Sequence, residues 1–288
     1  MTTGNLVIGC KGIQGKKRMA HTPNVIGVDV GDLWPDHKSY YAGIVCVPDH
    51  AKFDICRNLL EAGKHVMVEK PALFTDSQFD EIEILCNLKQ LAFYTAYNHR
   101  FEPHIQEMEI LALRESSFIT AFYGNGTAHK VKGTWRDYGA GCAREIGVHL
   151  LDMLYMVDGP FDAEWHVYAA TNSITNSPDY VLFGTHGIAL ETSWISWLND
   201  FRFNVIFSNE SYHAEGFRKW NGASYIERRV TGGKPNENKK SWIGQDTTWD
   251  DEYRYFISSA CRHGMNMLPR DRWIAKIMRQ IDAQLGVE

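Results

Sequence analysis

The segment LVIGCKGIQG, residues 6–15, decides the fold class of this 288-residue chain. Its first three residues are apolar and β-prone, which predicts a short buried strand. Gly9, Gly12 and Gly15 follow directly, and a helical pattern comes next. Glycines at such a turn allow a tight bend and let backbone N–H groups approach a pyrophosphate at the positive end of the helix. The segment therefore predicts a nucleotide-binding α/β unit, with a glycine turn in an unrelated α/β protein as the alternative.

Asp29 closes the next predicted strand, twenty positions after Gly9. A carboxylate at that place accepts hydrogen bonds from ribose hydroxyls and repels a 2′-phosphate, so we expect NAD in preference to NADP. The glycine spacing is GxxGxxG instead of GxGxxG, and Lys11 stands where a glycine is expected.

Strands and helices alternate through the first third of the chain. Apolar runs at 25–28, 43–47, 66–68 and 91–96 are separated by helical patterns that include 51–62 and 75–89. This alternation predicts a parallel sheet that is covered by helices on both faces. One interval is unusually short, because Asp29 and Ile44 are only 15 positions apart. A helix, a strand and another helix normally occupy that interval, so we expect an abbreviated sheet that lacks an outer strand beside the adenosine site.

The pattern changes after Tyr97. We expect helices at 103–113 and 142–156, successive strands from 165 to 230, a loop at 231–240 and closing helices near 250–262 and 271–285. Strands without helices between them are typical of a mostly antiparallel sheet. The sequence thus predicts a dinucleotide-binding domain over residues 1–97, shortened between 30 and 43. A substrate-binding and oligomerisation α+β domain follows over residues 98–288, and its C-terminal helices are candidates to pack back on the first domain.

Composition excludes several classes of function. The formal net charge is -5 and the basic residues are scattered, which gives no basis for binding nucleic acid. No apolar stretch approaches the length of a membrane span. The six cysteines form no CxxC pair, and the sequence starts without a secretory signal, so we expect reduced thiols and a cytoplasmic protein. Histidines and cysteines lack the spacing of a metal site, so we expect none.

Two further motifs carry polar chemistry. Lys70, in Glu69-Lys70-Pro71, follows a predicted strand at the edge where open α/β sheets bind ligands, and partial desolvation there lowers a lysine pKa toward the range useful for proton transfer. Glu145, His149 and Asp152 stand at i, i+4 and i+7 on one helix face, where acids orient a histidine that accepts protons near neutral pH. The alternatives are a surface lysine in a turn and a solvated polar helix face.

Taken jointly, four stretches resemble the Gfo/Idh/MocA family, the group of glucose–fructose oxidoreductase and inositol dehydrogenase. They are VCVPDH at 45–50, EAGKHVMVEKP at 61–71, YNHRF at 97–101 and GAGCAREIGVHLLD at 139–152. The resemblance covers nearly the whole chain, and the second stretch is its most specific part. Glu145 stands where the family has an aspartate.

The resemblance implies a Rossmann-like domain followed by an α+β domain whose open sheet forms a homo-oligomer, a dimer or tetramer. It also implies roles for individual residues. Lys70 would be the catalytic or substrate-orienting lysine and His149 an acid or base, while Asn98, Glu145 and Asp152 would meet the substrate. Arg136 is a candidate partner for a phosphate or carboxylate of the substrate. The implied cofactor-binding residues are Gly9, Gly12, Gly15, Asp29, Pro48, His50 and Glu69.

We therefore expect an NAD-dependent dehydrogenase or reductase that acts on a hydroxyl-bearing carbon of a sugar, cyclitol or nucleotide-sugar. Its partner is a small molecule, and neither nucleic acid nor a membrane is expected. The rival is a non-catalytic member, a ligand sensor or scaffold that has lost its cofactor. Lys70, His149 and Asp152 favour catalysis, whereas the short interval after Asp29 favours the rival. The glycine spacing also suits amino-acid-pathway reductases.

Overall fold

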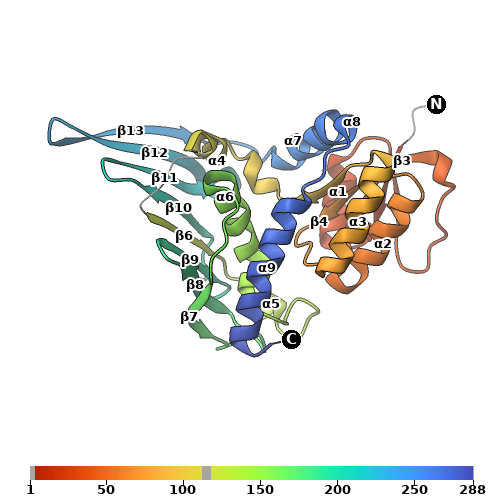
Figure 1. The fold of residues 1–288 in the computed structure, drawn as a ribbon, viewed down its shortest axis with the longest axis horizontal. Coiled ribbons are helices and arrows are strands. Elements are labelled where there is room, and N and C mark those ends of the chain that lie inside the picture. The colour runs from red at the N-terminus through yellow and green to blue at the C-terminus, as the bar shows by residue number, and fades with distance from the viewer. Residues whose placement is uncertain (1–3, 112–117, 288) are drawn as a thin grey trace. The chain divides into compact units, whose positions relative to one another are not determined.

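The computed structural model describes residues 4–111 and 118–287 (Figure 1). The chain divides into two compact units. The first contains residues up to Asn98 together with Thr247–Ala275, and the second contains His99–Asp246 together with Lys276–Glu288. A late segment of the chain therefore belongs to the first unit. Among the described residues, no helix combines the length and the apolarity needed to cross a membrane.

The first unit is built on a five-stranded, fully parallel sheet in the order β2-β1-β3-β4-β5. The strands are β1 (Gly4–Ile8), β2 (Val25–Val28), β3 (Tyr40–Val45), β4 (His65–Glu69) and β5 (Phe93–Ala96). Helices α1 (Ile13–His21), α2 (Asp49–Glu61), α3 (Asp76–Lys89), α7 (Thr248–Tyr255), α8 (Cys261–His263) and the start of α9 (Leu268–Leu285) accompany it. The predicted α/β class is confirmed.

Two apolar clusters explain why this sheet is covered on both faces. Leu6 packs in one cluster with Leu59 of α2 and Phe79 of α3. The next residue, Val7, packs in the other cluster with Phe256, which directly follows α7. Side chains alternate between the faces of a strand, so an unbroken apolar run supplies both clusters.

The predicted loss of an outer strand is also confirmed. Residues 29–36 contain no strand, and a single 3-10 turn, His37–Ser39, leads into β3. The sheet consequently starts at β2. Asp29 and Asp32 close a tight turn, in which the N–H of Asp32 donates to the carbonyl of Asp29 at 3.0 Å and Gly31 has φ +85°. A positive φ at the third residue is the mark of a type II turn.

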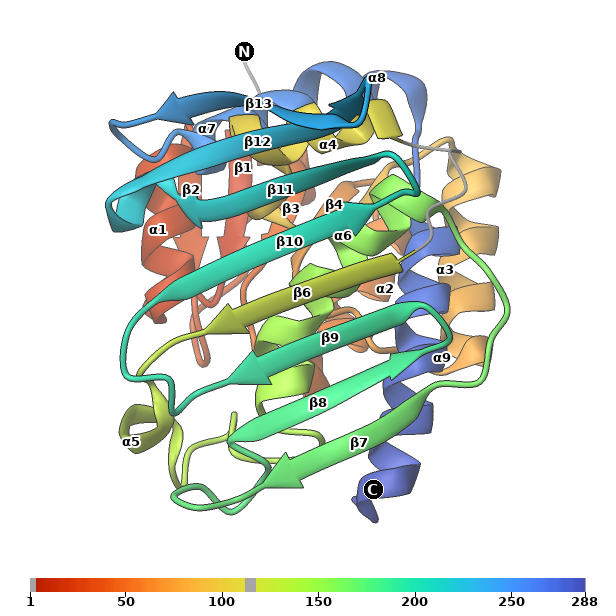
Figure 2. The ribbon, with the colours of Figure 1, turned by 90° about the vertical axis from the view of Figure 1, so that its left-hand side faces the viewer.

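The second unit contains an eight-stranded sheet in the order β13-β12-β11-β10-β6-β9-β8-β7 (Figure 2). Its strands are β6 (Phe118–Gly124), β7 (His166–Thr171), β8 (Tyr180–Thr185), β9 (Ile188–Ser193), β10 (Asp200–Ile206), β11 (Glu210–Phe217), β12 (Gly222–Thr231) and β13 (Lys234–Trp242). All neighbours are antiparallel except β6 and β9, so the predicted mostly antiparallel sheet is confirmed. Helix α6 (Val148–Asp158) covers one face, and the other face is open (Figure 2).

The helices of the second unit differ in detail from the expected ranges. The helix expected at 103–113 is α4 (Pro103–Met108) followed by a 3-10 turn, Glu109–Leu111, and its last two predicted residues lie outside the described part of the chain. The helix expected at 142–156 is a π-helical turn, Ala143–Gly147, that continues into α6. A short helix α5 (Ala128–Val131) lies between them in the sequence.

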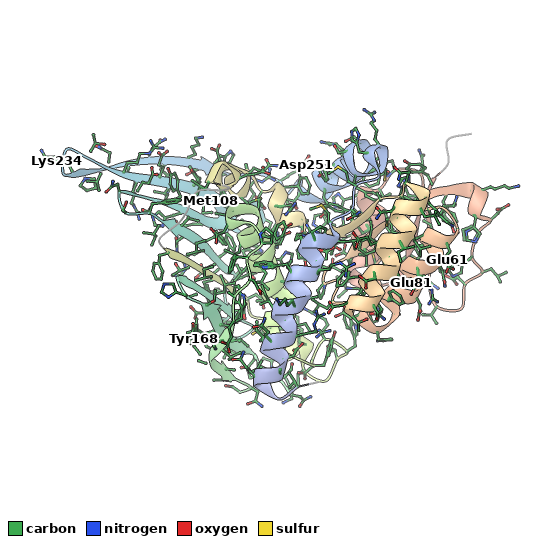
Figure 3. All side chains as sticks on the ribbon, in the orientation of Figure 1. Glu61, Glu81, Met108, Tyr168, Lys234 and Asp251 are labelled. Atoms are coloured by element: carbon green, nitrogen blue, oxygen red, sulfur yellow. The ribbon has the colours of Figure 1, made fainter. Side chains whose placement is uncertain are left out.

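The expected loop at 231–240 is wrong. Residues 234–242 form β13, which pairs with β12 through a hairpin whose turn contains Gly232 and Gly233. Both glycines have positive φ, +59° and +76°, as a two-residue hairpin turn requires. Polar residues cover both sides of β13 because it is an exposed edge strand, where Pro235 is tolerated. Lys234 marks the tip of this hairpin in Figure 3.

Candidate active site

Predicted site residues follow the carboxyl ends of all five strands of the first unit. Gly9 comes after β1, Asp29 after β2, Pro48 after β3, Lys70 after β4 and Asn98 after β5. Because the strands are parallel, these residues lie along one edge of the sheet, the edge at which open α/β sheets bind ligands.

At two of its glycines, the loop leaves no space for a side chain. A Cβ on Gly9 would collide with the carbonyl oxygen of Cys46, and one on Gly15 with the carbonyl oxygen of Gly9. Gly9 also has φ +81°, which favours glycine. Gly12 is the N-cap of α1, and its own Cβ would come no nearer than 3.3 Å to another residue. The loop therefore presents the free N–H groups of a helix N-terminus to a phosphate, and the residues present fit a dinucleotide.

We expect Gly15→Ala to weaken NADH binding by about tenfold or more. The new methyl group would collide with the carbonyl of Gly9 and displace the turn, at a cost of about 1–3 kcal/mol. Ser77→Ala, an exposed substitution in the first turn of α3, is the control, since that helix carries none of the predicted cofactor-binding residues. Calorimetric titration of both variants with NADH measures the difference. Equal NADH affinities of the two variants would show that the cofactor does not bind at the glycine loop.

Asp29 is tied to the glycine loop. Its carboxylate accepts the backbone N–H of Lys11 at 2.8 Å and that of Val30 at 2.9 Å. These backbone hydrogen bonds, that of Lys11 first, hold the pKa of Asp29 below its usual range. The Lys11 ammonium, which departs from the glycine pattern, pairs with Asp32 at 3.3 Å. The charge of Asp29 thus persists at the end of β2, beside the helix N-terminus.

Both sequence neighbours of Lys70 are bound by buried cations. Glu69 accepts a hydrogen bond from Nε of Arg18 at 2.7 Å, and the carbonyl of Pro71 accepts one from Nζ of Lys52 at 2.8 Å. Arg18 and Lys52 are 1% and 2% exposed. Glu69 was predicted to bind cofactor, and its carboxylate is engaged by Arg18 instead of open to solvent, so that role stays a prediction.

The remaining predicted residues of the first unit follow β3 and β5. Pro48 is the N-cap of α2, and His50 is exposed in the first turn of that helix. Asn98 is buried, and its Nδ2 donates to Oγ1 of Thr248 at 2.9 Å. These three residues thus share the edge with Lys70.

The second unit brings together the polar residues of the 139–152 stretch. His149 is 4% exposed, and its ring lies 4.4 Å from the ring centroid of His99. Asp152 accepts two hydrogen bonds from Arg100, at 2.9 and 3.2 Å from Nη2 and Nε. Glu145 pairs with Arg136. Each acid predicted to flank the histidine is therefore bound to an arginine.

Burial shifts the pKa values of two more groups in this unit. Burial lowers the pKa of Arg136 from its usual value and raises that of the Tyr123 phenol. Nε2 of His99 lies 3.2 Å from the hydroxyl of Tyr123. His149, His99 and Tyr123 thus form a packed ring cluster on the helix-covered side of the sheet, where β6 contributes the tyrosine.

Comparison with known proteins identifies the chain. Residues 9–97 match the family model GFO_IDH_MocA, described as "Oxidoreductase family, NAD-binding Rossmann fold". Residues 9–97 belong to the NAD-binding domain of the Gfo/Idh/MocA family. The resemblance seen in the sequence is therefore confirmed, and the matched residues include the glycine loop, Asp29 and Lys70.

Individual relatives agree with this family membership. The uncharacterised oxidoreductase YfiI of Bacillus subtilis is 33% identical over 105 residues, which are 33% of this chain and 26% of the relative. The uncharacterised oxidoreductase YrbE of the same organism is 25% identical over 60% of this chain and 50% of its own. The matches thus span half or less of these relatives' lengths.

Solved structures match over the whole chain and establish the fold. A levoglucosan dehydrogenase in complex with NADH has a TM-score of 0.80 at 16% identity and covers 99% of this chain and 97% of its own. A UDP-N-acetylglucosamine 3-dehydrogenase, GnnA from Acidithiobacillus ferrooxidans, has a TM-score of 0.79 at 13% identity, with 98% of each chain covered. The fold of the chain, its second sheet included, is therefore shared with these two dehydrogenase structures.

Several residues of this candidate site were not predicted from the sequence. Arg100 and His99 lie inside the quoted stretch YNHRF, so a signal existed for them. Arg18, Lys52 and Glu252 had none, because each acts on a residue far away in the sequence. Arg18, for example, donates to Glu252 across 234 positions.

Proposed function

We propose that this chain is an NAD-dependent dehydrogenase or reductase that acts on a hydroxyl-bearing carbon of a sugar, cyclitol or nucleotide-sugar. The observation that carries the proposal is the edge of the first sheet. There a cradle that only glycine fits, the anionic Asp29 and the fixed Lys70 follow neighbouring strands. The glycine loop and Asp29 would hold the cofactor, with Pro48 and His50 along the same edge.

The bound nicotinamide would supply the hydride acceptor or donor. The chain's own residues manage the proton and the orientation of the substrate. In the oxidising direction, Nζ of Lys70 or a ring nitrogen of His149 takes the proton of the substrate hydroxyl; in the reducing direction the same atom returns it. Asn98 and Asp152 orient the substrate, and Arg100 holds the carboxylate of Asp152 in place through two hydrogen bonds.

The substrate class rests on two supports. The printed names of similar structures include dehydrogenases of levoglucosan and of a UDP-sugar. Arg136, paired with Glu145 and partly buried, offers a guanidinium to a phosphate or carboxylate of the substrate. A nucleotide-sugar would use this arginine, whereas a plain sugar would leave its pairing with Glu145 intact.

The open face of the second sheet supports a homo-oligomer, a dimer or tetramer formed by that face. Phe118 and Tyr168 expose 45% and 56% of their surface there, and Figure 3 shows Tyr168 on the strand at one end of the sheet. Apolar side chains on an uncovered sheet face are typical of a surface that another chain covers. The six cysteines are unpaired thiols, which favours a reducing compartment such as the cytoplasm.

Titration of the purified protein with NADH and with NADPH tests the proposal. We expect micromolar affinity for NADH and affinity weaker by about tenfold or more for NADPH, because Asp29 is anionic. Asp29→Asn, which keeps an acceptor for the Lys11 N–H, should narrow that preference. Asp54→Asn is the control, since Asp54 is an exposed acid of α2 that pairs with Arg57.

The second candidate function is a non-catalytic ligand sensor or scaffold. The shortened segment 29–39 favours it, because the sheet ends at β2 beside the expected adenosine site. Failure of the folded protein to bind either nucleotide would reject the dehydrogenase and favour this alternative. Binding followed by turnover in a screen of sugars and nucleotide-sugars would reject the sensor.

A further inference from the structure

Helix α7 contributes a buried polar face to the first unit, although it begins some 150 positions after β5. Its buried residues are Thr248, Trp249 and Glu252. Thr248 and Glu252 are four positions apart, so both lie on one face of the helix. Each is 0% exposed. Buried polar side chains require hydrogen-bond partners, so the identity of these partners shows what the face does.

Thr248 contacts the residue that follows β5. Its Oγ1 accepts a hydrogen bond from Nδ2 of Asn98 at 2.9 Å, and Asn98 is itself 8% exposed. This hydrogen bond joins two buried side chains and restricts the position of the Asn98 amide. Thr248 thus holds the side chain of Asn98 in place.

Glu252 contacts the end of β4 through an arginine. Its Oε2 accepts from Nη2 of Arg18 at 2.6 Å, and Nε of the same arginine donates to Glu69 at 2.7 Å. The guanidinium of Arg18 also lies 4.3 Å from the ring centroid of Trp249. Glu69 of β4, together with Glu252 and Trp249 of α7, therefore surrounds the guanidinium of Arg18. This cation orients Glu69, the residue directly before Lys70.

We propose that Thr248 and Glu252 are positioning residues of the active site. Thr248 orients Asn98, and Glu252 orients Lys70 through Arg18 and Glu69. This inference rests on the proposed function, in which Asn98 and Lys70 meet the substrate. The geometry gives the late segment 247–275 a role in catalysis in addition to packing, since one helix face fixes groups at the ends of two neighbouring strands.

Three variants test the two contacts, and one serves as control. Thr248→Val removes the hydroxyl with little change of shape, and Thr248→Ser restores it. Glu252→Gln removes the charge that meets Arg18. Asp251→Asn removes a charge from the adjacent position of α7, which is labelled in Figure 3. The carboxylate of Asp251 binds Thr247 and Arg254 instead.

The first readout is hydrogen–deuterium exchange of the intact protein without nucleotide. We expect Glu252→Gln to speed exchange in peptides that cover 69–74, and Thr248→Val in peptides that cover 97–101, with Asp251→Asn near wild type. The second readout is steady-state turnover of the substrate found in the screen. We expect kcat to fall by about ten- to a hundredfold at unchanged NADH affinity, and Thr248→Ser to recover it, since small misplacements of reacting groups cost that much.

Full turnover in both Thr248→Val and Glu252→Gln would overturn the proposal. A uniform rise of hydrogen–deuterium exchange across the first unit in these variants would also overturn it, because α7 would then only stabilise the unit as a whole. Failure of the proposed function gives a different result: the wild-type protein itself would bind neither nucleotide, while the local exchange changes would still report the two contacts.

Discussion

Lys70→Met is expected to lower kcat by about two to four orders of magnitude, the usual contribution of a positioned acid or base. Methionine keeps most of the apolar stem and removes the ammonium group that exchanges the proton. The backbone at this position should not move, because Glu69 and Pro71 are each bound by a buried cation. NADH affinity should therefore stay within about threefold of wild type, which calorimetry measures.

Lys64→Met is the matched control. Lys64 directly precedes β4, whereas Lys70 directly follows it, so the two lysines lie at opposite ends of one strand. The ammonium of Lys64 lies 5.3 Å from the ring centroid of Tyr40, away from the carboxyl edge. This control should turn over at the wild-type rate. A Lys70→Met variant that is equally active would remove Lys70 from the mechanism.

Arg18→Met is expected to destabilise the protein by about 3–5 kcal/mol, the usual result of removing one partner from a buried ion pair. The change leaves Glu69 and Glu252, 8% and 0% exposed, without the cation that both contact. Urea unfolding of the intact protein measures this loss in the free energy of unfolding. Lys16→Met, on the exposed side of the same helix, is the control and should change stability by less than about 0.5 kcal/mol.

This loss should depend on pH in a defined direction. Burial raises the pKa of Glu252 from 4.5 to about 7, and Arg18 opposes that rise. The folded protein thus binds a proton that the unfolded chain releases near pH 4.5, and the free energy of unfolding falls as pH rises from there to about 7. Without Arg18 the pKa of Glu252 should rise further, so the decline should extend to higher pH. Parallel stability curves for wild type and variant would contradict this coupling.

Much of the first unit could be predicted because its signals are local. The apolar runs at β1, β3 and β4 are buried on both faces, and such runs form parallel strands without regard to the rest of the chain. The 15 positions between Asp29 and Ile44 cannot contain a helix, a strand and a second helix, so chain length alone predicted the missing strand. The hairpin at 231–242 escaped prediction, because an exposed edge strand has no apolar face to reveal it.

The sequence by itself determined the parallel sheet, its glycine cradle and the edge at which Lys70 lies. Tertiary structure alone decided what surrounds those residues. The arginine partner of Asp152 is 52 positions away, and the carboxylates of Glu69 and Glu252 meet on Arg18 from segments 183 positions apart. Local patterns report contacts within a few residues of the chain, whereas a buried charge takes whichever opposite charge the folded chain brings to it.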